Sequence, residues 1–406
     1  MNIKFPKSLS IIIDRIISHG IKLYIVGGFV RDTISGIDSK DFDLVHDADL
    51  EKILPLLHVK NPQINYSYEI INFKLDKYNI ELARMRSDYN YTGRHSEIRF
   101  VDSIEDDLPR RDFTVNALAV DLKNGKLYDL FNGKRDIEEK KLRTIGDPDR
   151  RFTEDAFRMI RCASFAVRKN FSIHYDTLDA IHRNRSLINQ LSKGLVKHEL
   201  LKMLRHPNNI NFLKIMQKAK LIEIIFDVKN LKNVIYKDFE KTPASAELIL
   251  SYMFVMHNVD ADTIKTTLSK LNFSKATTKS VSFITQHFYG IKDILDKQDW
   301  QSDEKDLRKI AMFLGSDLVS DILDILNIMG YRRVVLEEYF PNIFETIPIS
   351  GSEIKNLFKI DDLNNYKSVR DEIRYQYLRG KINDIEEIKL FAETYLKSIP
   401  SVNLID

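Results

Sequence analysis

The chain has 406 residues and a mass of 47.5 kDa. A single hydrophobic core rarely organises a chain of this length, so two to four domains are expected. Its 62 Lys and Arg against 59 Asp and Glu exclude a histone-like basic protein and an acidic disordered chain, and 43% hydrophobic residues suffice for packed cores. A single cysteine, Cys162, excludes a disulfide framework and a cysteine-based zinc site, which favours the cytoplasm. No apolar run reaches 18 residues, so no membrane span is expected.

The order of predicted elements indicates an α+β chain. Eight of the 14 glycines lie in the first 146 residues, where short strand-like runs occur at 22–28, 40–45, 69–75, 79–86, 97–101 and 116–122. Helical stretches then recur at 153–169, 176–190, 194–205, 245–257 and 261–271. We therefore expect a domain with a sheet, followed by a helical remainder.

A glycine pair ends the first strand-like run. Gly27 and Gly28 let the backbone approach a ligand closely at the start of a helix, where N–H groups suit a phosphate and Arg31 adds a guanidinium. The spacing matches neither the dinucleotide-binding fingerprint nor the P-loop. A plain turn explains the glycines equally well.

Two aspartates follow in the second strand-like run. Asp41 and Asp43 are two residues apart, so in a strand both carboxylates share one face, and oxygen ligands of this kind suit Mg²⁺ together with substrate phosphates. Glu81 is the candidate third carboxylate of a two-metal site, although Arg84 or Arg86 is an alternative partner for it. The competing interpretation of the aspartates is a solvated pair on an edge strand.

Two further clusters carry arginines. Arg110 and Arg111 adjoin an apolar run and suit a triphosphate, or else pair with the acidic residues at 105–107. In the second cluster, Thr153 is the expected N-cap of a helix on which Asp155 and Arg158 project together. An ordinary solvated ion pair is the alternative there.

In this order the motifs resemble those of class II CCA-adding tRNA nucleotidyltransferases, a pattern shared with bacterial poly(A) polymerases. The motifs are G-G-x-x-R-D at 27–32, D-x-D at 41–43, R-R-D-F-T-x-N-A at 110–117 and R-F-x-E-D-x-x-R-x-x-R at 151–161. The resemblance covers residues 20–175. It implies a polymerase-β-like nucleotidyltransferase head with a small mixed or antiparallel sheet (1–146), followed by an all-α neck (147–208), body (209–305) and tail that contacts tRNA (306–406).

The resemblance also implies an activity, namely template-independent transfer of CMP and AMP from CTP and ATP to the tRNA 3′ end, with release of pyrophosphate. By that resemblance Asp41 and Asp43 hold Mg²⁺ in a two-metal reaction. Glu81 stays the candidate for a further catalytic carboxylate on the ground of its position among apolar residues, not of the resemblance. The resemblance implies that eight residues bind the nucleotide: Gly27, Gly28, Arg31, Arg111, Asn116, Asp155, Arg158 and Arg161. Poly(A) addition, CC-only addition and A-only addition are the alternatives.

Base selection by Asp155 and Arg158 has a physical rationale. A carboxylate acceptor beside a guanidinium donor matches the donor–acceptor edge of both cytosine and adenine, whereas uracil and guanine present a carbonyl and an N–H there. Each unpaired group costs ~1–3 kcal/mol, which rejects UTP and GTP about ten- to hundredfold per group. One departure from the family is Ser164, which stands where a third arginine often occurs.

The positive charge is concentrated. Residues 150–205 contain twelve Lys and Arg against five Asp and Glu, which predicts RNA phosphate contacts that weaken with salt. The candidate RNA-binding residues are Arg94, which lies in the loop at 84–95, and Arg168, Lys169 and Lys197. The full length of that loop favours addition of the terminal A.

Overall fold

The computed structural model describes residues 1, 3–92, 95–229, 231, 233–239, 244–297, 300–314, 318–331, 333–343, 345, 347–357 and 363–398. Its contacts divide the chain into two compact units. The first contains Met1–Met203 and Lys214–Asp227, and the second contains Leu204–Leu213 and Val228–Asp406. The four-part division into head, neck, body and tail stays a prediction.

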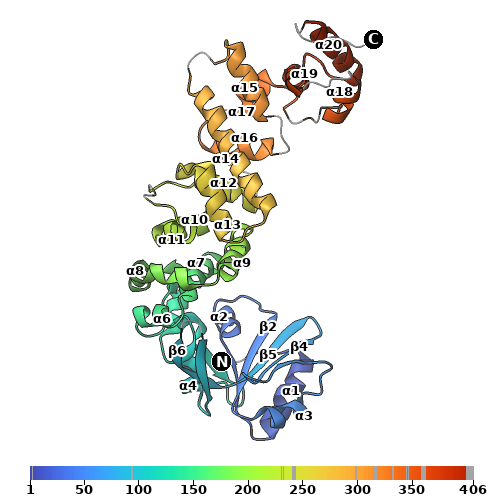
Figure 1. Cartoon of the computed structure of the whole chain (residues 1–406). Helices are drawn as coiled ribbons and strands as arrows, with labels where there is room; N and C mark the ends of the chain where they lie inside the picture. The colour runs from blue at the N-terminus through green and yellow to red at the C-terminus, as the bar shows by residue number, and fades with distance from the viewer. Residues whose placement is uncertain are drawn as a thin grey trace. The chain divides into compact units, whose positions relative to one another are not determined.

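A mixed seven-stranded sheet forms the centre of the first unit (Figure 1). Its strand order is β3-β4-β5-β2-β1-β8-β9, and β2 and β5 are its one parallel pair. The strands are β1 (Leu23–Val26), β2 (Asp41–His46), β3 (Gln63–Asn65), β4 (Ile70–Leu75), β5 (Tyr78–Arg84), β8 (Leu118–Asp121) and β9 (Leu127–Asp129). The antiparallel pair β6 (Arg86–Thr92) and β7 (His95–Phe100) forms a separate ribbon. The predicted α+β class with a small mixed sheet is confirmed.

The two faces of this sheet differ. Phe42 and Leu44 of β2 are buried on one face, where Phe42 stacks on Phe29 of α2 (Gly28–Ile34) with ring centroids 4.7 Å apart. On the opposite face Val45 and Ala83 belong to an apolar cluster with Ile104 and other buried residues. Because strand side chains alternate, Asp41 and Asp43 share this second face with Val45. Along β2 this second face therefore changes from acidic at Asp41 and Asp43 to apolar at Val45.

Short helices cover the sheet. α1 contributes four buried apolar residues (Leu9, Ile12, Ile13 and Ile16), spaced as an amphipathic helix requires. Figure 1 shows α1 beside α3. The helical elements up to residue 138 are α1 (Lys7–Ser18), α2, α3 (Leu50–Leu57), α4 (Ile104–Asp107), the 3₁₀ turns η1 (Leu108–Arg110) and η2 (Thr114–Asn116), and α5 (Gly133–Glu138).

The helical part of the first unit begins earlier than predicted. Thr153 is not an N-cap: α6 (Pro148–Glu154) starts at Pro148, with Asp147 as the cap, and Thr153 lies inside it. Pro148 favours the first helical position because its missing N–H has no partner to lose there. The chain then breaks at Asp155 before α7 (Phe157–Lys169). The remaining elements are β10 (Lys141–Leu142), parallel to β11 (Ser172–Ile173), α8 (Tyr175–Asn184), η3 (Arg185–Gln190), α9 (Lys193–Leu204) and α11 (Leu221–Phe226). α10 (Asn209–Lys218) is divided between the two units at Leu213.

The regular elements of the second unit are helices wherever its residues are described. One of its cores packs Ile354, Val369, Ile373 and Ile388 with further apolar residues. Nowhere in the described ranges is a helix both long enough and apolar enough to cross a membrane. The helices that lie wholly in the second unit are α12 (Ala246–Met256), α13 (Ala261–Lys270), α14 (Lys275–Leu295), α15 (Glu304–Leu314), α16 (Val319–Ile328), α17 (Arg333–Tyr339), α18 (Gly351–Leu357), α19 (Leu363–Leu378) and α20 (Ile385–Ser398).

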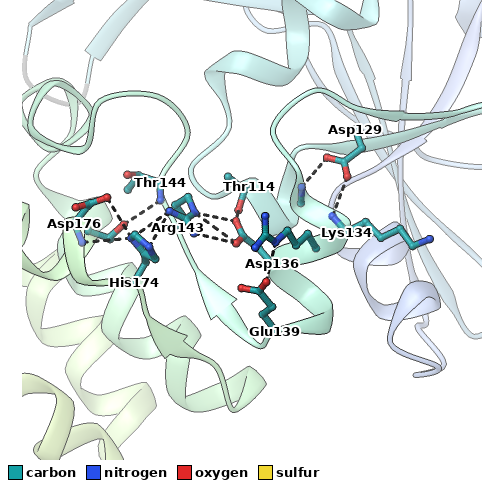
Figure 2. Close-up of polar contacts among 12 residues, drawn as sticks. Thr114, Asp129, Lys134, Asp136, Glu139, Arg143, Thr144, His174 and Asp176 are labelled. Atoms are coloured by element: carbon teal, nitrogen blue, oxygen red, sulfur yellow. Dashed lines mark hydrogen bonds and ion pairs between the residues drawn. The ribbon is translucent and has the colours of Figure 1, made fainter.

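A polar network joins the sheet region to α8 (Figure 2). The buried carboxylate of Asp136 accepts a bond from Thr114 Oγ1 (2.6 Å) and faces Arg143 Nε (3.3 Å). Arg143 Nη1 in turn lies 3.2 Å from His174 Nδ1, and His174 caps α8 by accepting from the backbone N–H of Asp176. The network thus fixes the segment that contains Thr114 against the helical part of the same unit.

Gly133 stands at a tight point of this network. A Cβ at Gly133 would lie 2.3 Å from the backbone oxygen of Thr114, so Gly133→Ala forces the backbone to move. We expect a loss of ~1–3 kcal/mol in the free energy of unfolding, as for other overpacked sites. Gly194→Ala is the matched control, since a Cβ there meets nothing within 4 Å. Urea unfolding of both variants checks the prediction, and equal stabilities would contradict it.

Candidate active site

The two aspartates lie at the acidic end of β2. Asp41 is exposed and accepts a bond from Asn79 Nδ2 (2.8 Å), and Asp43 is partly buried. The parallel register sets Asp43 directly opposite Glu81 of β5. Directly opposed residues of neighbouring strands present their side chains on the same face, so three carboxylates share one small area.

The alternative partners of Glu81 are engaged elsewhere. Arg84 pairs with Asp49 (2.7 Å) and Glu69 (3.3 Å), and Arg86 pairs with Asp88 (3.4 Å). Glu81 is exposed. Its carboxylate therefore contributes negative charge to the surroundings of Asp43.

The negative charge of Glu81 affects the pKa of Asp43. Burial, and then the negative charge of Glu81, raise the pKa of the Asp43 carboxyl to about 6, with a smaller contribution from Asp41. The positive charges of Arg111 and Arg31 oppose the rise without cancelling it. An excess of negative charge at closely spaced carboxylates is the condition that a bound divalent cation relieves.

The donor set fits a hard cation that keeps other ligands. In the part of the chain that the structure describes, no three His, Cys, Asp or Glu side chains converge closely enough to hold a metal unaided. Oxygen donors from one or two carboxylates, completed by water and substrate phosphate, are the coordination that Mg²⁺ prefers. Asp41 and Asp43 thus suit Mg²⁺ if a phosphate ligand is present.

The glycine turn lies against this acidic area. Gly27 has φ +65°, which an L side chain rarely adopts, and a Cβ on it would lie 3.1 Å from Arg111 Nη1 and 3.8 Å from Asp43 Oδ2. A Cβ on Gly28 would lie 3.5 Å from Arg31 Nη2. The absent side chains leave the backbone open between one carboxylate and two guanidinium groups. An anionic ligand at this turn would meet two cations.

Arg31 is oriented by buried contacts. Its Nε and Nη2 bind Asp32 Oδ1 at 2.9 and 2.8 Å, and its Nη1 donates to Asn116 Oδ1. The guanidinium also lies 5.0 Å from the ring centroid of Phe165 in α7. Lys169 Nζ, 3.0 Å from Asp32 Oδ1, ties the same carboxylate to α7. Arg31 and Asn116, both of which are predicted to contact the nucleotide, are therefore in direct contact with each other.

Arg111 is held by one of the upstream acids. Asp107 is fully buried, and its Oδ2 accepts from Arg111 Nη2 (3.0 Å), so the pairing alternative applies to this residue. The backbone oxygens of Arg110 and Arg111 both accept bonds from Arg151 Nη2 of α6. The arginine pair is thus anchored through its side chains and through its main chain.

The break between α6 and α7 changes the predicted geometry of Asp155 and Arg158. Asp155 is extended rather than helical, and its Oδ1 accepts from the N–H of Phe157 (3.0 Å). Arg158 is buried and donates through Nη1 to Glu154 Oε2 (3.2 Å) and to the backbone oxygen of Arg151 (3.0 Å). The i, i+3 relation on one helix was wrong, because the helix that contains Arg158 begins after Asp155.

The other predicted residues divide between the site and its surroundings. Arg161 has a half-exposed side chain and binds Asp112 Oδ2 (2.6 Å), and Asp112 Oδ1 accepts from Asn116 Nδ2 (3.0 Å). Arg168 is exposed and Lys197 is partly buried, whereas Lys169 is paired with Asp32. Arg94 lies outside the described residues.

Sequence reasoning named Asp107 only as one of three acids that could pair with Arg110 and Arg111, and it missed Asp32 and Glu154 as partners of arginines. Asp107, Asp32 and Glu154 each bind a guanidinium at less than one tenth exposure. Asp32 and Glu154 belong to the motifs, and each lies within four residues of its arginine. That spacing was the available signal, but it does not show which nearby acid is buried.

Comparison with known proteins adds the family. Residues 23–143 match the model of the poly A polymerase head domain, and residues 170–233 match that of the probable RNA and SrmB-binding site of polymerase A. The CCA-adding enzyme of Lactobacillus helveticus (strain DPC 4571) is 30% identical over 312 residues, which are 75% of this chain and 78% of that protein.

Solved structures share the fold. A CCA-adding enzyme in complex with CTP aligns with a TM-score of 0.70 at 19% identity, over 98% of this chain and 97% of that chain. The Thermotoga maritima CCA-adding enzyme complexed with tRNA aligns with a TM-score of 0.65 at 18% identity, over 98% of this chain and all of that chain. At these identities the likeness concerns the fold alone.

The proximity of Glu81 to Asp43 can be tested by titration. In metal-free protein Asp43 should titrate near pH 6, and Glu81→Gln should move its pKa down toward the ordinary 3.8, because one neighbouring negative charge is removed. Glu51→Gln, an exposed change in α3, is the control. Carboxyl carbon NMR titration measures both, and an unmoved Asp43 pKa in Glu81→Gln would contradict the arrangement.

Proposed function

Because the chain belongs to the family of CCA-adding enzymes, which are nucleotidyltransferases, we propose that it adds C, C and A to the 3′ end of tRNA with CTP and ATP as donors. One observation carries the assignment of the reaction to particular residues. The open backbone at Gly27 lies beside both Arg111 Nη1 and Asp43 Oδ2. The groups proposed to bind phosphate and those proposed to bind the metal thus lie close together.

The triphosphate is bound at the glycine turn in this proposal. Arg111 and Arg31 supply positive charge, and the missing side chains at Gly27 and Gly28 let phosphate oxygens approach the main chain. Asn116 orients Arg31 by accepting its Nη1 bond. A triphosphate bound in this way would bring its α-phosphorus near the carboxylates, which is a positioning contribution to the rate.

Asp41 and Asp43 would hold Mg²⁺, with Glu81 as the adjacent third carboxylate. When bound, the metal neutralises developing charge and favours the ionised form of the attacking hydroxyl. One of the two aspartates promotes transfer of the tRNA 3′-hydroxyl proton to water. The 3′ oxygen then forms a bond to the α-phosphorus as the bond to pyrophosphate breaks, so electrons and charge leave with pyrophosphate.

Base selection is assigned to Asp155, Arg158 and Arg161. Glu154 holds Arg158 through Nη1, while Nη2 makes a long contact of 3.5 Å to the backbone oxygen of Arg110. Among the described contacts of the Arg158 guanidinium, the Nη2 contact is the weaker one, so Nη2 is the donor that we assign to a base. Arg161 keeps half of its side chain exposed. Asp155 supplies the acceptor next to Arg158, which matches the edges of cytosine and adenine.

Poly(A) addition is the second candidate, because the head matches a model described as that of poly A polymerase. The two candidates differ in when synthesis stops. A CCA-adding enzyme stops after the terminal A, whereas a poly(A) polymerase continues with ATP alone.

An extension assay separates the products. tRNAs that end in the discriminator base, in -C, in -CC and in -CCA are offered with each of the four NTPs, and the products are sequenced. We expect completion to -CCA with CTP and ATP, no extension of -CCA, and UTP and GTP use reduced at least ~10-fold. Runs of A on every substrate would replace the proposal with poly(A) addition, and equal use of UTP would contradict the proposed base selection.

Asp41→Ala tests the metal-binding assignment. Loss of one carboxylate should lower nucleotide addition by at least ~100-fold, because the charge that holds the cation is removed. Binding of tRNA, measured by filter retention, should persist. Asp38→Ala, an exposed aspartate just before β2, serves as the control. Unchanged addition by Asp41→Ala would refute the assignment.

A further inference from the structure

We propose that Asp107 is a positioning residue that fixes the guanidinium of Arg111 at the glycine turn, and so sets the affinity of the site for the triphosphate. The inference rests on the proposed function, since it concerns how the same site holds its nucleotide. Asp107 itself does not reach the glycine turn in this account. It acts through Arg111.

The first observation is that both oxygens of the Asp107 carboxylate accept hydrogen bonds. Asp107 ends α4 and is fully buried. Its Oδ2 accepts from Arg111 Nη2 (3.0 Å), and its Oδ1 accepts from Arg110 Nε (2.8 Å) and from the backbone N–H of Arg86 (3.2 Å). Charge-assisted bonds of this kind fix direction as well as distance.

The carboxylate stays charged in this environment. Burial alone would raise the pKa of Asp107, but the positive charges of Arg111 and Arg110 and the Arg86 N–H hold the pKa below its ordinary value. A buried negative charge with two cationic partners is costly to rearrange, because either partner left alone would be an uncompensated charge. The pairing is therefore a rigid support for Arg111.

The second observation concerns the other two nitrogen atoms of the Arg111 guanidinium, Nη1 and Nε. Nη1 lies 3.1 Å from the position that a Gly27 Cβ would occupy, at the open backbone of the turn. Nε is buried and has no hydrogen-bond partner among the residues that the structure describes. Asp107 thus holds one terminal nitrogen and leaves the other directed at the place where phosphate would bind.

The third observation separates positioning from folding. The main chain of Arg110 and Arg111 is held independently of Asp107, by bonds from Arg151 Nη2 to both backbone oxygens. Removal of the Asp107 charge therefore releases the Arg111 side chain while the backbone keeps its anchor. The expected defect is in triphosphate binding rather than in the fold.

The test uses Asp107→Asn, which keeps the volume and one oxygen, with Asp106→Asn as the matched control on the exposed side of the same short helix. KM for CTP and the inhibition constant of inorganic tripolyphosphate should both rise ~10- to 100-fold in Asp107→Asn, with kcat changed less than KM. Asp106→Asn should match the unaltered protein. Thermal melting shows whether each variant is folded, and Asp107→Ser is the second variant if Asp107→Asn is not.

A double-mutant cycle with Arg111→Gln shows whether Asp107 acts through Arg111. If it does, Asp107→Asn has little further effect on KM once Arg111 is replaced. Additive effects of the two changes, a KM like that of the unaltered protein in Asp107→Asn, or failure of both Asp107 variants to fold would overturn the inference.

Failure of the proposed function is distinguishable from failure of the inference. If the unaltered full-length protein adds no nucleotide to tRNA, the proposed function fails on that control alone. Calorimetric binding of tripolyphosphate to the unaltered protein and to Asp107→Asn then still measures the positioning effect. Equal affinities of the two proteins would overturn the inference.

Discussion

Parallel hydrogen bonding between β2 and β5 places Asp43 opposite Glu81, and the arrangement of the site follows from that register. A shift by one residue would turn Asp43 toward the apolar face that Phe42 and Leu44 occupy, where a charged carboxylate would have no partner. The buried apolar side chains of β2 therefore fix the direction of the acidic ones. The packing of one sheet face thereby specifies the chemistry of the other.

Three arginines predicted to bind the nucleotide are each held by a buried carboxylate. Asp107 binds Arg111, Asp32 binds Arg31, and Glu154 binds Arg158. Buried ion pairs of this type are weak contributors to stability, because desolvation offsets much of the attraction. Their consistent placement beside the glycine turn and the start of α7 is better explained by the direction they give to the guanidinium groups.

The candidate site could be predicted from the sequence where the inference depended on local geometry. The two-residue spacing of Asp41 and Asp43 is enough to put both on one face of a strand, and the glycine pair marks a close backbone approach without tertiary information. The opposition of Glu81 and Asp43 could not be predicted in this way, because it depends on the register of two strands separated by β3 and β4. Short strands such as β3 and β9 carry too few residues to show alternation.

The helix boundary at Asp155 shows a second limit. Asp155 at i−3 and Glu154 at i−4 are both suitable partners for Arg158 on a continuous helix, and sequence spacing does not choose between them. The end of α6 at Glu154 decides the matter, since it leaves Asp155 extended. Asp107 is a similar case: three adjacent acids look alike in sequence, and only the packing of α4 buries the third.

The central claim is that the triphosphate and the metal meet between the Gly27 turn and the Asp41–Asp43 face. Crystals grown with Mn²⁺ and a non-hydrolysable CTP analogue test it most directly, because Mn²⁺ is located by its anomalous scattering. We expect Mn²⁺ bound to Asp41 and Asp43, with phosphate oxygens against Gly27, Gly28 and Arg111. Nucleotide and Mn²⁺ bound away from these residues would contradict it.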